Sequence, residues 1–143
     1  MPTIARLYGQ ALTSILSKKI DFVADDVRVA LLNNTYVPNQ DTNTFMSDVV
    51  GFELSGGNYS RKSLTGKSLT YGGDTNTVTY DAADVTFTNL TGTLRHAVFF
   101  VNTGSDNSSP LICWMDFGAD IAAAAQDFKI VFPPQGLLQA VTP

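Results

Sequence analysis

The chain has 143 residues, of which 44% are hydrophobic and 15% are charged, and its formal net charge is −4. Because its nine basic residues are scattered along an acidic chain, the composition argues against direct binding of nucleic acid. No apolar run approaches the roughly 18 residues of a membrane-spanning helix, and the single cysteine, Cys113, cannot form a disulfide within the chain. The first residues lack a basic region followed by an apolar core, so we expect no signal peptide and synthesis in the cytoplasm.

Residues 3–17 have the pattern of an amphipathic helix. Apolar side chains recur at the spacing that places them on one stripe of a helix: Ile4, Leu7, Tyr8, Ala11, Leu12, Ile15 and Leu16. Thr3 is the expected N-cap, and Lys18 and Lys19 suit the negative end of the helix dipole. We expect this helix, within residues 1–19, to pack over a sheet of its own chain; the alternative is an arm that docks on a neighbouring subunit.

The next part of the chain predicts one strand followed by a long loop. The far half of residues 27–32 is continuously apolar, which is typical of a strand that is covered on both faces. Residues 33–46 form a long polar loop, but its aromatic and methionine side chains are too apolar for a free linker. We therefore expect this loop to be fixed to a surface, with a short helical turn capped by Ser47 after it.

The middle of the chain predicts strands with one exposed face. Residues 67–71 and 77–80 are separated by the turn formers of residues 72–76, which indicates a hairpin. In residues 85–88, two apolar side chains alternate with two threonines. This alternation predicts a strand with one face toward the core and one toward water.

The most apolar part of the chain predicts a second hairpin, at the centre of a sheet. Its strands are residues 93–101 and 110–117, and the polar turn formers of residues 102–109 join them. Both strands contain unbroken apolar runs, whereas a strand with a wet face alternates. This hairpin is therefore expected to be covered on both faces.

The C-terminal part predicts a short connection and two more strands. The alanine-rich stretch at residues 120–125 fits a short helix or a connector equally well. Residues 128–132 form a strand that two prolines stop, and residues 136–141 form the last strand. About eight to ten short strands separated by turn signals predict a mainly β fold, an antiparallel β-sandwich or open barrel with one N-terminal amphipathic α-helix. We find no domain boundary, so residues 1–143 are expected to form a single domain.

No set of residues has the pattern of a catalytic or metal site. His96, the single histidine, enters an apolar run and is expected to be structural, and Cys113 lies in a strand predicted to be buried. Residues 41–43 and 74–76 have alternating oxygen ligands, as calcium loops do, but Asx-turns explain both more simply. We therefore expect no enzyme, no cofactor and no metal site.

Several stretches of the sequence resemble a family of small proteins encoded among the structural genes of tailed bacteriophages. The stretches that carry this resemblance are residues 29–32, 36–42, 45, 47–49, 53–59, 84–87, 95–98 and 110–118. The similarity extends from the N-terminal helix to Phe132, and it departs from the family at Trp114 and Met115, where a small residue or tyrosine is usual. The resemblance implies a component of the virion, made in the host cytoplasm, and it implies no catalytic residues.

Within a virion, the expected role is that of a capsid decoration (cement) protein on the outside of the head shell. Its expected partners are the major capsid protein or other virion proteins, together with copies of itself, preferably as a trimer. The contact elements would be the N-terminal helix and the loops at residues 33–46 and 102–109. The candidate interface residues are Leu7, Tyr8, Tyr36, Pro38, Phe45 and Met46.

Two other roles remain open at this point. The first keeps the chain in the virion as a neck or tail adaptor, or as a fibre-attachment protein. The second, from another class, is a carbohydrate- or calcium-binding module. Its aromatic candidates for stacking on sugars are Tyr59, Tyr71, Tyr80 and Trp114.

Overall fold

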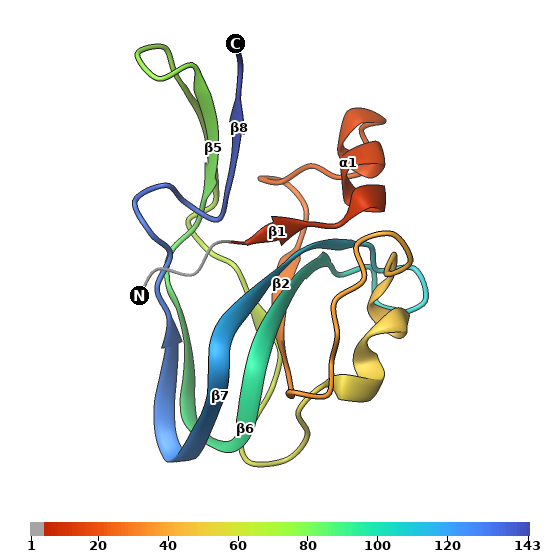
Figure 1. Cartoon of the computed structure of the whole chain (residues 1–143), viewed down its shortest axis with the longest axis vertical. Coiled ribbons are helices and arrows are strands. Elements are labelled where there is room, and N and C mark those ends of the chain that lie inside the picture. Colours follow the sequence, from red (N-terminus) through yellow and green to blue (C-terminus); the bar gives the residue numbers. More distant parts are fainter. Residues whose placement is uncertain (1–4) are drawn as a thin grey trace.

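The computed structural model describes residues 5–143, which form two antiparallel sheets and one α-helix (Figure 1). The elements in chain order are β1 (Arg6–Leu7), α1 (Gly9–Leu16), β2 (Val27–Leu32), η1 (Met46–Asp48), η2 (Val50–Phe52), β3 (Lys62–Ser63), β4 (Ser68–Gly72), β5 (Thr77–Asp81), β6 (Val85–Val101), β7 (Leu111–Ile130) and β8 (Leu138–Val141). One sheet has the order β1-β7-β6-β2-β3 and the other has the order β4-β5-β8. The predicted mainly β class is confirmed. We call the first sheet, with the segments that cover it, the body, and the second sheet the blade.

The β6–β7 hairpin is the centre of the body, as the apolar runs predict. Its ladder extends from the pair Val85↔Ile130 to the pair Phe100↔Leu111, and β2 pairs with the other side of β6. Ala97 and Phe99 belong to one hydrophobic cluster, and Val98 belongs to a second cluster on the opposite face. The expected cover on both faces is therefore confirmed.

The two clusters differ in what covers them. The first cluster lies on the side of the sheet toward the base of the blade and includes Tyr80 and Leu137. The second cluster lies under the start of α1 and the long loop, and it includes Tyr8, Ala11 and Met46. Sequence-distant segments supply both covers, and they enclose the half of the hairpin that contains residues 96–101 and 111–115.

The N-terminal helix begins later than the sequence predicts. Arg6 and Leu7 form β1, paired with Trp114 and Cys113 at the edge of β7, and the N–H of Tyr8 donates to the carbonyl of Ile112 at 3.0 Å. The sheet edge thus binds the backbone groups that a helix would have used. The helix starts at Gly9, and the expected cap, Thr3, lies outside the described residues. The prediction of a helix from residue 3 is wrong over residues 5–8.

The alanine-rich stretch is neither a helix nor a connector, because it continues strand β7. Ala122 and Ala123 pair with Thr93 and Gly92 of β6. Ala125 has a positive φ of 50°, and its N–H donates to the Thr91 hydroxyl at 3.0 Å where the ladder shifts register. Pairing with a long neighbouring strand overrides the helical preference of alanine.

The blade extends away from the body, as Figure 1 shows for β5 and β8. The predicted hairpin of residues 67–71 and 77–80 is confirmed as β4 and β5, and β8 adds the third strand along the other side of β5. At its base, the Tyr80 and Phe22 rings are 4.4 Å apart, and the Tyr80 hydroxyl donates to the Phe22 carbonyl at 3.0 Å. Tyr80 therefore anchors the blade to the body.

Candidate interaction surface

One face of the blade is entirely apolar. The register places Leu69 beside Tyr80 and Leu138, and the next row places Tyr71 beside Val78 and Ala140. Since side chains in a strand alternate between faces, all six of these side chains share one face. Residues between them, such as Thr70 and Thr79, lie on the opposite face.

This apolar face forms one wall of a groove of about 650 Å³. Leu12 and Ile15 of α1, together with Phe22, line the other side. The groove is open to water, because Leu69 is 50% exposed and Tyr71, further along the same strand, is 58% exposed. Large apolar side chains gathered at one exposed place are typical of interaction surfaces.

The loop at residues 33–46 is fixed to the body, as expected. The Tyr36 hydroxyl donates to Asn43 Oδ1 at 2.9 Å, and the Tyr8 hydroxyl, 2.6 Å away, therefore donates to Tyr36. Burial raises the pKa of Tyr36 to about 12 and raises that of Tyr8 further. At its far end the loop is closed by Met46, which is completely buried, and by the Asp48 carboxylate, which accepts the N–H groups of residues 44 and 45.

The candidate interface residues are therefore divided between the core and the surface. Tyr8, Tyr36 and Met46 belong to the second hydrophobic cluster, so in this structure their side chains have no surface to offer a partner. Leu7 and Pro38 are partly exposed, and Phe45 is 38% exposed. Leu7 also lines the groove beside the blade, whereas Phe45 lines a smaller pocket near residues 101–111.

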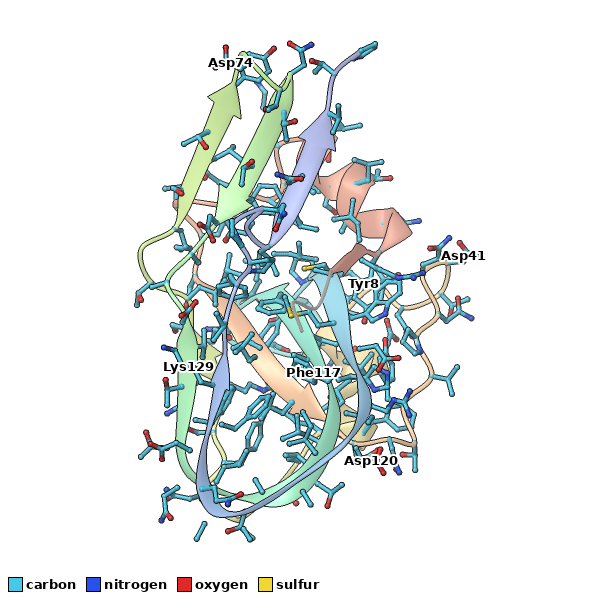
Figure 2. The ribbon with its side chains drawn as sticks, turned by 60° about the vertical axis from the view of Figure 1, so that its left-hand side comes forward. Tyr8, Asp41, Asp74, Phe117, Asp120 and Lys129 are labelled. Atoms are coloured by element: carbon cyan, nitrogen blue, oxygen red, sulfur yellow. The ribbon has the colours of Figure 1, made fainter. Side chains whose placement is uncertain are left out.

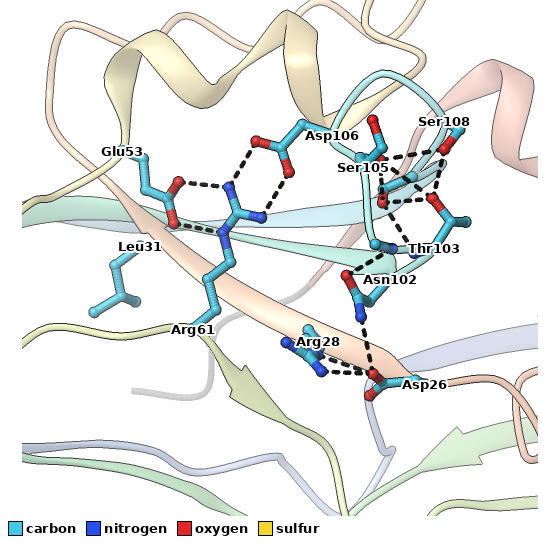
Figure 3. Close-up of polar contacts among 12 residues, drawn as sticks. Asp26, Arg28, Leu31, Glu53, Arg61, Asn102, Thr103, Ser105, Asp106 and Ser108 are labelled. Carbon is cyan, nitrogen blue, oxygen red and sulfur yellow. Dashed lines mark hydrogen bonds and ion pairs between the residues drawn. The ribbon is translucent and has the colours of Figure 1, made fainter.

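A charged cluster, which sequence patterns did not predict, fixes the loop at residues 102–109 (Figure 3). Arg61 binds both Glu53, with Nη2–Oε1 at 2.8 Å, and Asp106, with Nη1–Oδ1 at 2.7 Å. Its guanidinium also lies over the Phe100 ring, 5.2 Å from the centroid. Hydrogen bonds from Arg61 hold the pKa of Asp106 below its ordinary value. The sequence shows Arg61 only as one of a basic pair, because its two acidic partners are distant along the chain.

The two residues that sequence analysis considered for catalysis lie away from the groove. His96 is buried, and its Nε2 is 3.7 Å from Asp116 Oδ2, which is too long for a hydrogen bond. Burial lowers the pKa of His96, although the charge of Asp116 opposes this shift. Cys113 is fully buried, and burial raises the pKa of its thiol. Among residues 5–143, neither side chain lines the groove or the smaller pocket.

The calcium and carbohydrate candidates find little support in this arrangement. Asn39 Oδ1 accepts the N–H groups of Asp41 and Thr42, both at 3.1 Å, which is an Asx-turn. Within the described part of the chain, no three acidic, histidine or cysteine side chains are grouped to hold a metal ion. Of the four aromatic side chains considered for sugars, Tyr71 is the exposed one; Tyr80 and Trp114 are buried, and Tyr59 is partly buried with its hydroxyl donating to Glu53.

Comparison with known proteins adds no relative. No protein-family model, curated protein or solved structure matches the chain. None of the helices in the described residues is long and apolar enough to cross a membrane. A function can therefore be inferred only from the chain itself, and the blade and groove are the features that we use.

Proposed function

We propose that this chain is a virion structural protein of a tailed bacteriophage, which binds the outside of the head shell as a decoration protein. The observation that carries the proposal is the blade: a sheet with an exposed apolar face, held out from an enclosed body. Such a surface suits binding to another protein. The resemblance to phage structural proteins supplies the virion as the setting.

A second exposed region supports the same role. The fixed loop at residues 33–46 exposes Val37 and Phe45, and neither of these side chains lines the groove. A protein that bridges subunits of a shell needs two separate contact surfaces. The blade and this loop meet that requirement, with the major capsid protein as the proposed partner.

The alternative within the same class is a neck or tail adaptor. It would use the same surfaces, but it differs in stoichiometry, because a closed ring at the neck holds about three to twelve copies and a head shell holds on the order of hundreds. The structure of the single chain is equally compatible with a position on the head shell and one at the neck or tail. Copy number therefore distinguishes them.

The test is to count this chain in purified virions by quantitative mass spectrometry against the major capsid protein, and to locate it in a cryo-electron microscopy map. Hundreds of copies on the outer surface are the expected result. A ring of a few copies at the neck or tail would support the adaptor instead. A virion that lacks the chain altogether would overturn both.

A further inference from the structure

The single histidine of the chain, His96, is buried where the long loop at residues 33–46 meets the body. It is 3% exposed, and on β6 it lies opposite Leu32 of β2 and Asp116 of β7. The Tyr36 ring packs against it, with 5.3 Å between the ring centroids and the two planes at 88°. His96 is therefore in contact with an aromatic side chain that fixes the loop.

The imidazole ring of His96 lacks the acceptors that its charged form needs. Nδ1 is buried without a hydrogen-bond partner in the described part of the chain, and Nε2 is 3.7 Å from Asp116 Oδ2. The other oxygen of this carboxylate already accepts from Arg95 Nε at 3.1 Å and from the N–H of Gly118 at 2.8 Å. A neutral ring carries one N–H donor, whereas a protonated ring carries two. Protonation in this position therefore leaves a buried donor without an acceptor, which is costly.

Neighbouring groups on β6, β7 and the loop act on the charge of this ring. Burial is the strongest influence and lowers the pKa of His96 below its ordinary value. The Asp116 carboxylate opposes this shift of the pKa, as does the Asn33 carbonyl, which lies outside hydrogen-bond geometry with Nδ1, while the charge of Arg95 adds to the shift. The titratable group that packs on the ring from the loop is Tyr36, which stays neutral because burial raises its pKa to about 12. The closed loop thus favours the neutral form of His96.

Tyr36 is the one buried side chain within residues 33–43 of the loop. Its hydroxyl is bonded to Tyr8 and Asn43, whereas most residues around it are exposed, including Asp41, which Figure 2 shows at the outer edge of the molecule. Withdrawal of Tyr36 from the body exposes the imidazole ring of His96 to water. Water then supplies the acceptors that the protonated ring lacks.

We propose that His96 makes this loop sensitive to pH, because uptake of a proton by its ring releases residues 33–43 from the body. Below the ordinary histidine pKa of about 6.5, the open form binds a proton more readily than the closed form, so acidification increases the open population. Linkage to one proton limits this increase to about tenfold for each pH unit, and the increase ends below the lowered pKa of the closed form. The inference concerns the purified protein and does not depend on a role in a virion.

The first test follows the loop by hydrogen–deuterium exchange at about pH 7.5 and about pH 5, a range in which histidine is the only side chain whose ordinary pKa lies inside it. After correction for the intrinsic effect of pH on exchange, peptides from residues 33–43 should lose protection several-fold at the lower pH, whereas peptides from the β6–β7 hairpin should keep theirs. Unchanged protection of the loop would overturn the inference. An equal loss in the hairpin would also overturn it, because the body itself would then be unfolding.

The second test removes the titratable ring. His96→Phe keeps an aromatic ring against Tyr36, and His96→Gln keeps a neutral polar side chain, so a folded variant of either kind should protect the loop equally at both pH values. The matched control is Tyr8→Phe, which removes the hydroxyl bonded to Tyr36 but keeps the histidine. It should speed up exchange of the loop at both pH values and preserve the effect of pH. Circular dichroism checks the folding of each variant, and a pH effect that persists in a folded His96 variant would refute the proposed role of the ring.

The third test needs no variant, because NMR titration of the wild-type chain measures the proton uptake directly. The ring signals of the single histidine should change with a midpoint below about 6.5, and the amide signals of residues 33–43 should change with the same midpoint. If the ring becomes protonated while these amide signals stay unchanged, the inference is wrong, because Asp116 then accommodates the charge without release of Tyr36.

Discussion

The body and the blade are built from the same kind of element, antiparallel strands, but they use their apolar side chains differently. In the body, both faces of the central hairpin are covered, so that Phe99 and Phe100 are completely buried. In the blade, one face is mostly polar, and the apolar face is covered only at its base. The comparison shows that the extent of cover, more than the composition of a strand, separates the region that stabilises the fold from the region available for contacts.

The largest expected loss of stability comes from a substitution in the core of the body. Phe99→Ala removes a completely buried side chain of the first hydrophobic cluster, which packs on the Phe132 ring at 5.9 Å between centroids. We expect the free energy of unfolding in urea to fall by about 3–5 kcal/mol. Leu69→Ala in the blade, measured at low protein concentration, should cost less than about 1 kcal/mol because half of the side chain is already exposed. Equal losses for the two variants would mean that the blade is part of the stabilising core.

The next effect tests the charged cluster of the body. Arg61→Ala leaves the Glu53 carboxylate, whose side chain is 10% exposed, without its cationic partner. We expect a loss of about 2 kcal/mol in the free energy of unfolding. Arg28→Ala is the matched control, because its pair with Asp26 is exposed to solvent and should contribute less than about 1 kcal/mol.

The loss of stability caused by Arg61→Ala is expected to depend on pH. Because the pKa of Asp106 is lowered in the folded state by Arg61, the stabilisation from this pair is complete above the ordinary carboxyl pKa of about 4. It is lost as the pH falls through the lowered pKa. The stability difference between wild type and Arg61→Ala should therefore shrink when the pH is reduced from about 6 to about 3. A difference that grows on acidification would contradict the assigned ion pair.

The smallest effect compares a single hydroxyl in the two regions. Tyr8→Phe removes the buried donor to Tyr36 and should cost about 1 kcal/mol by thermal or urea unfolding. Tyr71→Phe removes a hydroxyl that donates to Asn76 on the exposed blade, and its effect should stay within about 0.5 kcal/mol. If the two variants lose the same stability, the long loop is not held to the body by the Tyr8–Tyr36 contact.

Sequence patterns predict the parts of this fold that depend on local chemistry. The unbroken apolar runs indicate the central hairpin and its cover, and the turn formers after Tyr71 indicate the β4–β5 hairpin. The aromatic side chains of the long loop indicate that it is fixed to a surface. In each case the property that decides the structure, apolar pattern or turn preference, lies within a few neighbouring residues.

The remaining features depend on partners that are distant in the sequence. Arg6 and Leu7 leave the helical pattern because the edge of β7 binds their backbone, and the alanines after Ile121 become a strand because β6 lies beside them. The groove could not be predicted either. Alternation in β4 shows that one face is apolar, but only the fold shows that α1 faces it across an open space.

The pairing of β1 with β7 has a consequence for the order in which the protein assembles during synthesis. The ribosome releases Arg6 and Leu7 about a hundred residues before their partners, Trp114 and Cys113. Contacts so far apart in sequence form late, whereas the β6–β7 hairpin can close as soon as its own residues are free. Arg6 and Leu7 are thus made early but reach their final neighbours late, and the Tyr8 side chain stays exposed to solvent until β7 has formed.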